Sequence, residues 1–168
     1  MRYRLDVVAP SVAEVVRVAG GWLFDRVMAG WDVTVLVDGG ADDRPLQILG
    51  ADTGDLESAL AGGLQAPRPH ALAVSAELYA RDTRIRKGVR DALAAGQTEV
   101  TMWGESWPEE LRGSVDTVEH RLSVAARAFK VQALAAAAEP IDAIGFSEIF
   151  RTGAIACCPS AADLVPAS

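Results

Sequence analysis

The residues best suited to bind a ligand stand directly after segments that the sequence predicts to be strands. They are one serine, two carboxylates and two tryptophans: Ser11, Glu77, Glu105, Trp103 and Trp107. In open α/β sheets, ligands bind outside the carboxyl ends of the strands. Tryptophan supplies flat apolar surface and carboxylates supply fixed acceptors, a mixture that suits a sugar, a base or a cation. The loop 103–110 combines both, so a functional interpretation places a ligand site there.

An alternative interpretation of the same loop needs no ligand. In that interpretation Trp103 closes the hydrophobic core and Trp107 fixes the loop to the surface, because buried aromatic side chains serve packing more often than recognition. Glu77 and Glu105 would form a carboxylate pair for acid–base chemistry if the fold brought them together. Their spacing in the sequence does not by itself require this.

The motifs of common catalytic, metal and cofactor sites are missing. His70 and His120 are the only histidines, and neither stands in a recognisable Ser-His-Asp arrangement or at metal-ligand spacing. Lys87 and Lys130 are the only lysines, and neither follows the glycines of a P-loop. Non-glycine residues, among them Ser11, occupy the positions where a dinucleotide-binding turn needs glycine. We therefore predict no catalytic residue, no metal and no cofactor.

A basic helix face is the first of two surfaces that we expect to contact a partner. It lies on a helix predicted over 77–95, where one arc carries Arg84, Arg86, Lys87 and Arg90. The face suits an acidic partner, although a solvated surface explains the same pattern. A formal net charge of −7 opposes general nucleic-acid binding, because an acidic surface repels phosphate.

The second surface is an apolar face of the first predicted helix, which spans about 11–30. Phe24 and Met28 lie opposite its core stripe, so the helix is apolar on more than one side. Gly20 and Gly21 would let a neighbour approach this helix closely. That neighbour is either the alanine-rich helix 122–137 of the same chain or another subunit.

The order of predicted elements indicates the fold class. Strands are predicted at 4–8, 31–37, 45–49, 71–75, 99–103 and 143–150, and helices at 11–30, 55–61, 77–95 and 117–138. Interleaved strands and helices predict a three-layer α/β fold, with a mostly parallel sheet and helices on both faces. The strands at 31–37 and 45–49 are too close for a helical crossover. We therefore expect an antiparallel hairpin over about 32–49 at one edge of the sheet.

Length and composition complete the prediction. We expect one α/β domain over 1–153 and a flexible tail over 154–168. The arginine bias and the lack of asparagine are typical of GC-rich bacteria, and no signal peptide or membrane span is evident, which favours the cytoplasm. Cys157 and Cys158 are not expected to form a structural disulfide there.

Two functions remain open at this point. The leading hypothesis is a non-catalytic binding or scaffolding protein that acts through protein–protein contacts or as a homo-oligomer. The alternative is a small enzyme or small-molecule-binding domain with its site at the carboxyl ends of the strands, in the loop 103–110.

Overall fold

The fold is described by a computed structural model for residues 2–62, 68–105, 115–141, 144–153 and 163–166. In this part of the chain one sheet has the strand order β3-β2-β1-β4-β5-β7-β6-β8. The strands are β1 Arg4–Val8, β2 Asp32–Val37, β3 Asp52–Asp55, β4 Ala71–Ser75, β5 Glu99–Trp103, β6 Val115–Arg121, β7 Ser147–Gly153 and β8 Val165–Pro166. The helices are α1 Val12–Met28, α2 Arg44–Leu49, α3 Leu56–Ala61, α4 Ala76–Arg81, α5 Thr83–Ala95 and α6 Val124–Ala136.

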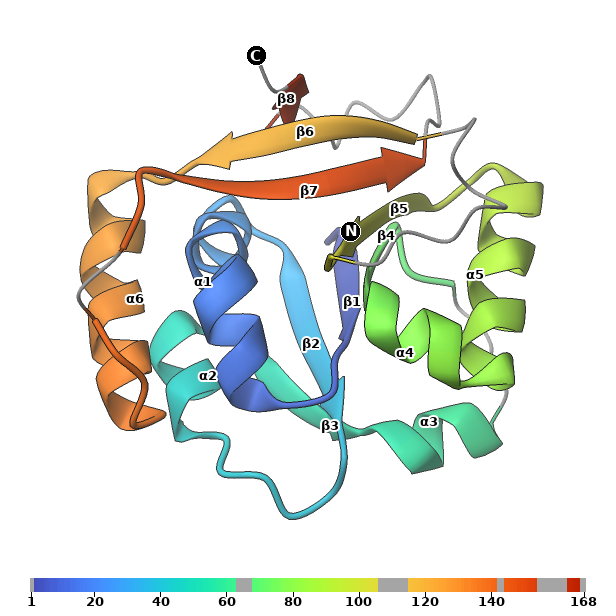
Figure 1. Cartoon of the computed structure of the whole chain (residues 1–168), viewed down its shortest axis with the longest axis horizontal. Helices are drawn as coiled ribbons and strands as arrows, with labels where there is room; N and C mark the ends of the chain where they lie inside the picture. Colours follow the sequence, from blue (N-terminus) through green and yellow to red (C-terminus); the bar gives the residue numbers. More distant parts are fainter. Residues whose placement is uncertain (1, 63–67, 106–114, 142–143, 154–162, 167–168) are drawn as a thin grey trace.

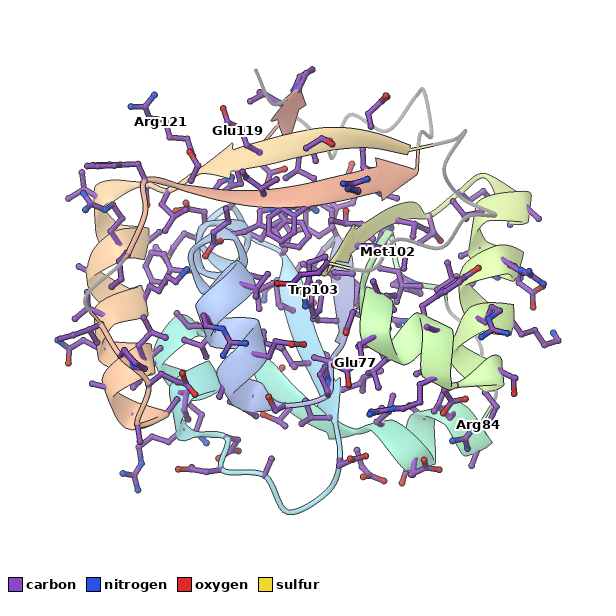
Figure 2. All side chains as sticks on the ribbon, viewed as in Figure 1. Glu77, Arg84, Met102, Trp103, Glu119 and Arg121 are labelled. Atoms are coloured by element: carbon purple, nitrogen blue, oxygen red, sulfur yellow. The ribbon has the colours of Figure 1, made fainter. Side chains whose placement is uncertain are left out.

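Helices cover both faces of the sheet, as the sequence predicted (Figure 1). One hydrophobic cluster joins α1, α2 and α6 to the sheet residues of one face, and a second joins α3, α4 and α5 to the other. Met102 and Trp103 are neighbours in β5 but belong to opposite clusters, because successive strand residues point to opposite faces (Figure 2). The predicted α/β class is therefore confirmed.

The topology creates one switch point between β1 and β4. From β1 the chain passes through α1 and α2 to β2 and β3 on one side, whereas β4 and β5 extend the sheet on the other side, with α3, α4 and α5 on the opposite face. All five strands are parallel, so their carboxyl ends share one edge. The crevice for a ligand in such sheets lies where the strand order reverses. Here that place is defined by the residues that follow β1 and β4.

The predicted hairpin over 32–49 is wrong. β2 pairs in parallel with both β1 and β3, and the segment predicted as a second hairpin strand is helix α2. Pro45 occupies the first turn of α2, where its missing N–H costs nothing, and Gly50 ends the helix in the left-handed conformation with φ 82°. Leu46 and Leu49 are buried at helical spacing. The real edge strand, β3, is polar and gave no sequence signal.

The predicted helix 117–138 begins too early. Residues 115–121 form β6, which runs antiparallel to β7, and the true N-cap of α6 is Ser123, whose Oγ accepts the N–H of Ala126. In β6, Val118 and His120 face inward and are buried, which is a strand period. The final strand likewise lies at 147–153 rather than 143–150.

Two smaller differences concern the ends of elements. The helix predicted over 77–95 is two helices, because Asp82 adopts an extended conformation and caps α5 by accepting the N–H of Arg84. The expected tail includes residues 163–166, which are not separate from the fold: β8 pairs with β6. Cys157 and Cys158 lie outside the described residues. None of the helices in the described segments is long and apolar enough to cross a membrane.

A buried ion pair is bonded to the middle of α1. The carboxylate of Glu148 accepts the N–H of Gly21 at 2.9 Å and of Trp22 at 2.6 Å, and pairs with Lys130 Nζ at 2.6 Å. Lys130 Nζ also donates to the carbonyl of Arg17, four residues before Gly21, at 2.8 Å. Glu148 from β7 thus binds N–H groups of α1, and Lys130 from α6 binds a carbonyl one turn earlier in the same helix. Burial raises the pKa of Glu148, and Lys130 and the two N–H groups oppose that rise.

Gly21 is the residue that lets Leu122, between β6 and α6, come close to α1, and replacing it tests this packing. A Cβ at Gly21 would overlap Leu122 Cγ and Cδ2, so Gly21→Ala should lower the free energy of unfolding by about 1–3 kcal/mol. Gly20→Ala is the control, because its nearest neighbours would lie 3.5 Å away and alanine favours a helix. Urea unfolding of both variants measures the difference. Equal stability of the two would contradict the close approach.

The two lysines of the chain form a matched test of the buried pair. Lys130→Met leaves a buried carboxylate without its counter-ion, so we expect a loss of about 3–5 kcal/mol in the free energy of unfolding. Lys87→Met removes an exposed pair with Asp91, and should leave stability unchanged within error. Denaturant titration of each single variant gives the comparison. A small effect at Lys130 would mean that the pair is not buried as described.

Candidate functional site

The carboxyl end of β1 leads directly into the N-terminus of α1. Ser11 is the N-cap, and its Oγ accepts the N–H of Glu14 at 3.2 Å. The Glu14 side chain reaches toward β5, where its Oε2 accepts the indole N–H of Trp103 at 3.4 Å. Glu14 also lies 3.9 Å from Arg17. A carboxylate from α1 is therefore fixed beside the last residue of β5.

Three small or aromatic side chains lie on the same face of the sheet as α1, at the carboxyl ends of the strands. Ser75 pairs in register with Trp103, and the alternation along β1, β4 and β5 places Ala9, Ser75 and Trp103 on the α1 face of the sheet. Ser75 is 2 % exposed, and no hydrogen bond of its side chain caps α4. Gly104 follows with φ 132° against Ala76. The switch point thus carries a hydroxyl, an indole N–H and a carboxylate within a few residues.

The structure brings only part of the predicted ligand set together. Ser11 and Trp103 are both hydrogen-bonded to Glu14, a site residue that the sequence analysis did not predict. Glu77 lies on the surface at the start of α4, paired with Arg81 at 3.2 Å (Figure 2). Glu105 is also exposed, and Trp107 lies outside the described residues. Trp103 is buried, so it supports the site from below and offers no stacking surface.

The basic side chains predicted to meet a partner have carboxylates or carbonyls of their own. Arg84 binds Glu57 at 2.9 Å and Asp82 at 3.0 Å, Lys87 binds Asp91, and Arg86 donates to the carbonyl of Ala80. Arg90 also has an interaction within the chain. The pairs with Glu57 and Asp82 tie α5 to α3 and to its own N-cap. These contacts favour the interpretation of a solvated face.

The apolar face of α1 packs within the same chain. Phe24 is 6 % exposed and stacks on Phe129 of α6, with the ring centroids 4.5 Å apart. The alanine-rich helix is therefore the neighbour that the sequence left undecided. Met28, at the end of α1, remains 69 % exposed.

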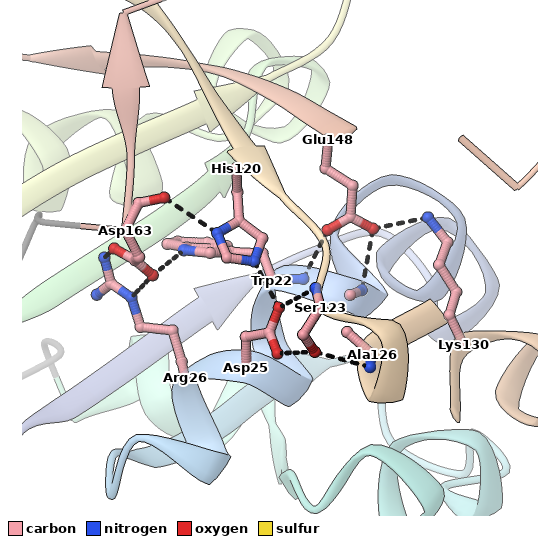
Figure 3. A network of polar contacts seen from close by, with 10 residues as sticks. Trp22, Asp25, Arg26, His120, Ser123, Ala126, Lys130, Glu148 and Asp163 are labelled. Atoms are coloured by element: carbon pink, nitrogen blue, oxygen red, sulfur yellow. Dashed lines mark hydrogen bonds and ion pairs between the residues drawn. The ribbon is translucent and has the colours of Figure 1, made fainter. Parts of the chain in front are cut away.

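A partly buried polar network lies under β6, and it contains an exposed serine, a buried histidine and an aspartate (Figure 3). His120 Nε2 lies 2.7 Å from Asp25 Oδ2, and Ser123 Oγ donates to Asp25 Oδ1 at 2.6 Å. The serine thus bonds to the carboxylate and not to the histidine, so His120 is not placed to take the serine proton as it would in a catalytic triad. Ser123 instead caps α6. The arrangement joins α1, β6 and α6 and is structural. His70 is structural too: its Nδ1 accepts the N–H of Arg4.

The network continues to a buried arginine at the end of α1. Arg26 is 1 % exposed and pairs with Asp163 through Nε and Nη2, both at 2.7 Å, and with Glu99 at 3.3 Å. Burial raises the pKa of Glu99, and the Asp163 carboxylate adds to the rise while Arg26 opposes it. These groups lie at the amino ends of the strands, away from the switch point.

The described residues do not supply a metal site. No group of three or more histidine, cysteine, aspartate or glutamate side chains lies close enough to hold an ion in these segments. Both ring nitrogens of His120 are bonded, and His70 Nδ1 already accepts a backbone N–H. A ligand set at the switch point would therefore have Glu14 as its only carboxylate with a fixed position.

Comparisons with known proteins find the same fold in solved structures. No protein-family model matches the sequence, and no curated protein matches it at a significant level. Solved structures do match. The A40926 pseudoaglycone deacetylase Dbv21 superimposes with a TM-score of 0.60 at 14% identity, over 94% of this chain and 100% of that one. A teicoplanin deacetylase in complex with teicoplanin gives 0.58 at 12% identity, over 98% and 99%.

A further match is a zinc-inhibited enzyme. It is the zinc-inhibited form of teicoplanin deacetylase Orf2, with a TM-score of 0.58 at 10% identity, over 89% of this chain and 97% of that one. At these identities the likeness shows the fold. The described residues of the present chain do not fit a zinc site, because no group of three potential ligands lies together among them.

The leading functional prediction is corrected by these matches. A non-catalytic scaffold acting through protein–protein contacts is contradicted, because the structures that share this fold over almost their whole length are deacetylases. The alternative prediction, a small enzyme or small-molecule-binding domain with its site at the carboxyl ends of the strands, agrees better with this finding.

Glu99 gives a prediction about pH. Its folded pKa is raised above the ordinary value of 4.5, so its contribution to stability is full below that pH and decreases as pH rises through the folded pKa. Glu99→Gln should remove this decrease, so the stability of the variant relative to wild type should improve as pH rises from 4 to 7. Urea unfolding across this pH range measures it. A difference that does not change with pH would contradict the raised pKa.

Proposed function

We propose that this chain is a small enzyme that hydrolyses an acyl group from a small-molecule substrate bound at the β1/β4 switch point. The observation that carries the proposal is the position of Glu14: its carboxylate is held by the Trp103 indole N–H at the carboxyl ends of the strands, where this fold class binds ligands. The fold shared with deacetylases supports the same reaction class.

Glu14 would act as the general base. It takes a proton from a water molecule as the water oxygen attacks the carbonyl carbon of the acyl group. The negative charge that develops on the carbonyl oxygen faces the N-terminus of α1, where the N–H groups of Val12 and Ala13 have no helical partner. The carbon–nitrogen bond then breaks, and Glu14 returns its proton to the leaving nitrogen. The products are a carboxylic acid and an amine, so atoms and charges balance.

The substrate proposed from the neighbours is an acetylated small molecule, since two of them are named for deacetylating antibiotics or their precursors. Of the residues predicted from the sequence, Ser11 would hold the substrate as well as cap α1, whereas Glu77 and Glu105 would line the rim. A homo-oligomer and a cytoplasmic location remain part of the proposal, supported by the sequence alone.

The test compares two glutamates at the same edge of the sheet. Purified protein is given a panel of N-acetylated amino sugars and N-acetylated amino acids, and released acetate is measured. For any compound that wild type hydrolyses, Glu14→Gln should reduce kcat by about 10²-fold or more. Glu57→Gln, which changes an exposed side chain paired with Arg84 at the start of α3, should stay within about twofold of wild type.

The controls separate loss of chemistry from loss of folding. Circular dichroism and thermal unfolding should be alike for both variants, because Glu14 is at the surface end of α1. Release of acetate that is unaffected by Glu14→Gln would contradict the role of Glu14. No release and no thermal shift with any compound of the panel would contradict the proposed reaction class.

A further inference from the structure

Arg26 and Trp22 form a three-donor cradle around one carboxylate. Arg26 Nε donates to Asp163 Oδ2 and Nη2 to Oδ1, both at 2.7 Å, and Trp22 Nε1 donates to Oδ2 at 2.9 Å (Figure 3). The two parallel bonds from the guanidinium are the geometry that arginine uses to recognise carboxylates. The cradle lies at the amino ends of the strands, so it is separate from the proposed active site.

The cradle is held in shape by groups other than Asp163. The Arg26 guanidinium lies between two indole rings, 4.8 Å from the centroid of Trp22 and 4.2 Å from that of Trp31. Glu99 pairs with Arg26 from β5 at 3.3 Å. One more donor, Arg26 Nη1, is buried and has no partner, and neither has Glu99 Oε2. A buried guanidinium fixed in this way is a preorganised site for an anion.

The carboxylate that fills the cradle is more exposed than the arginine that binds it. The Asp163 side chain is 27% exposed, whereas the Arg26 side chain is 1% exposed. The carboxylate therefore reaches solvent and the guanidinium does not. Within the described residues 163–166, Val165 and Pro166 form β8 beside β6, and Leu164 packs partly buried against the core. The charged contacts of these four residues are made by Asp163.

The site also recognises the backbone beside the carboxylate. His120 Nδ1 lies 3.0 Å from the carbonyl oxygen of Asp163, and a carbonyl only accepts, so Nδ1 is the donor. The next residues pair with β6 as an added strand. The combination selects an aspartate within an extended peptide, and not a free acid alone.

We propose that this cradle is an exchangeable docking site for an aspartyl peptide, occupied in this state by the chain's own residues 163–166. When the segment leaves, a second peptide that carries aspartate in an extended conformation takes its place by the same three donors, the His120 contact and pairing with β6. In the intact chain the tethered segment competes at a high effective concentration, so an external peptide binds weakly until the segment is displaced.

The experiment uses the full chain and a synthetic peptide. The peptide has the sequence of residues 160–168, and a second peptide carries asparagine in place of Asp163. We expect full-length Asp163→Ala to bind the aspartate peptide at least roughly tenfold more tightly than wild type does, because the mutation removes the tethered competitor. We expect the asparagine peptide to bind the same variant at least roughly tenfold more weakly, because it lacks the charge and one acceptor.

Titration with Trp fluorescence and calorimetry gives both affinities. Failure of folded Asp163→Ala to bind the aspartate peptide would overturn the proposal, as would equal binding of the two peptides. Hydrogen exchange of the wild-type chain covers the case in which the variant does not fold. The amide of Val165 should then exchange at least roughly tenfold faster than that of Val118, by local release of the segment. Equal protection of the two amides would mean that the segment never leaves the folded protein, which also overturns the proposal.

Discussion

The buried ion pair between Lys130 and Glu148 is the interaction on which the position of β6, β7 and α6 relative to α1 depends. It joins β7 and α6 to the backbone of α1 at Gly21, and thereby holds the antiparallel strands β6 and β7 over a helix that already packs on the parallel sheet (Figure 1). Two charges in a dry interior stabilise a fold only when their remaining hydrogen-bonding groups are satisfied. Here three backbone groups of α1 provide those bonds, so the charges specify the register between elements that apolar contacts alone would leave adjustable.

From this register follow two sites at opposite edges of the sheet. At the carboxyl edge, α1 delivers Glu14 to the indole of Trp103, beside the reversal of strand order. At the amino edge, the same helix delivers Trp22 and Arg26 to the carboxylate of Asp163. Helix α1, with 17 residues, therefore positions polar groups at both sites. Its orientation about its own axis determines which of its side chains reach each edge of the sheet.

The sequence predicted the parts of the fold whose residues follow a simple period. β1, β2, β4 and β5 are apolar runs, and α1 has a clear cap at Ser11, so their positions were predictable. The sequence-based prediction was wrong where a buried polar residue has a partner far away in the sequence. His120 interrupts the apolar alternation of β6, because it is hydrogen-bonded to Asp25 and Asp163. Glu14 was missed in the same way, since the partner that turns a first-turn carboxylate into a site residue is 89 positions away.

The central claim, a ligand site at the switch point, is tested most directly by the indole N–H signals of the four tryptophans in a nitrogen-15-labelled sample. Trp103→Phe assigns the signal of Trp103, and the protein is then titrated with N-acetylglucosamine and with acetate, the acid product of deacetylation. A ligand at the switch point should displace the signal of Trp103, which donates to Glu14, while the signals of Trp22 and Trp31 stay in place. Changes confined to Trp22 or Trp31, or none at any concentration, would contradict the claim.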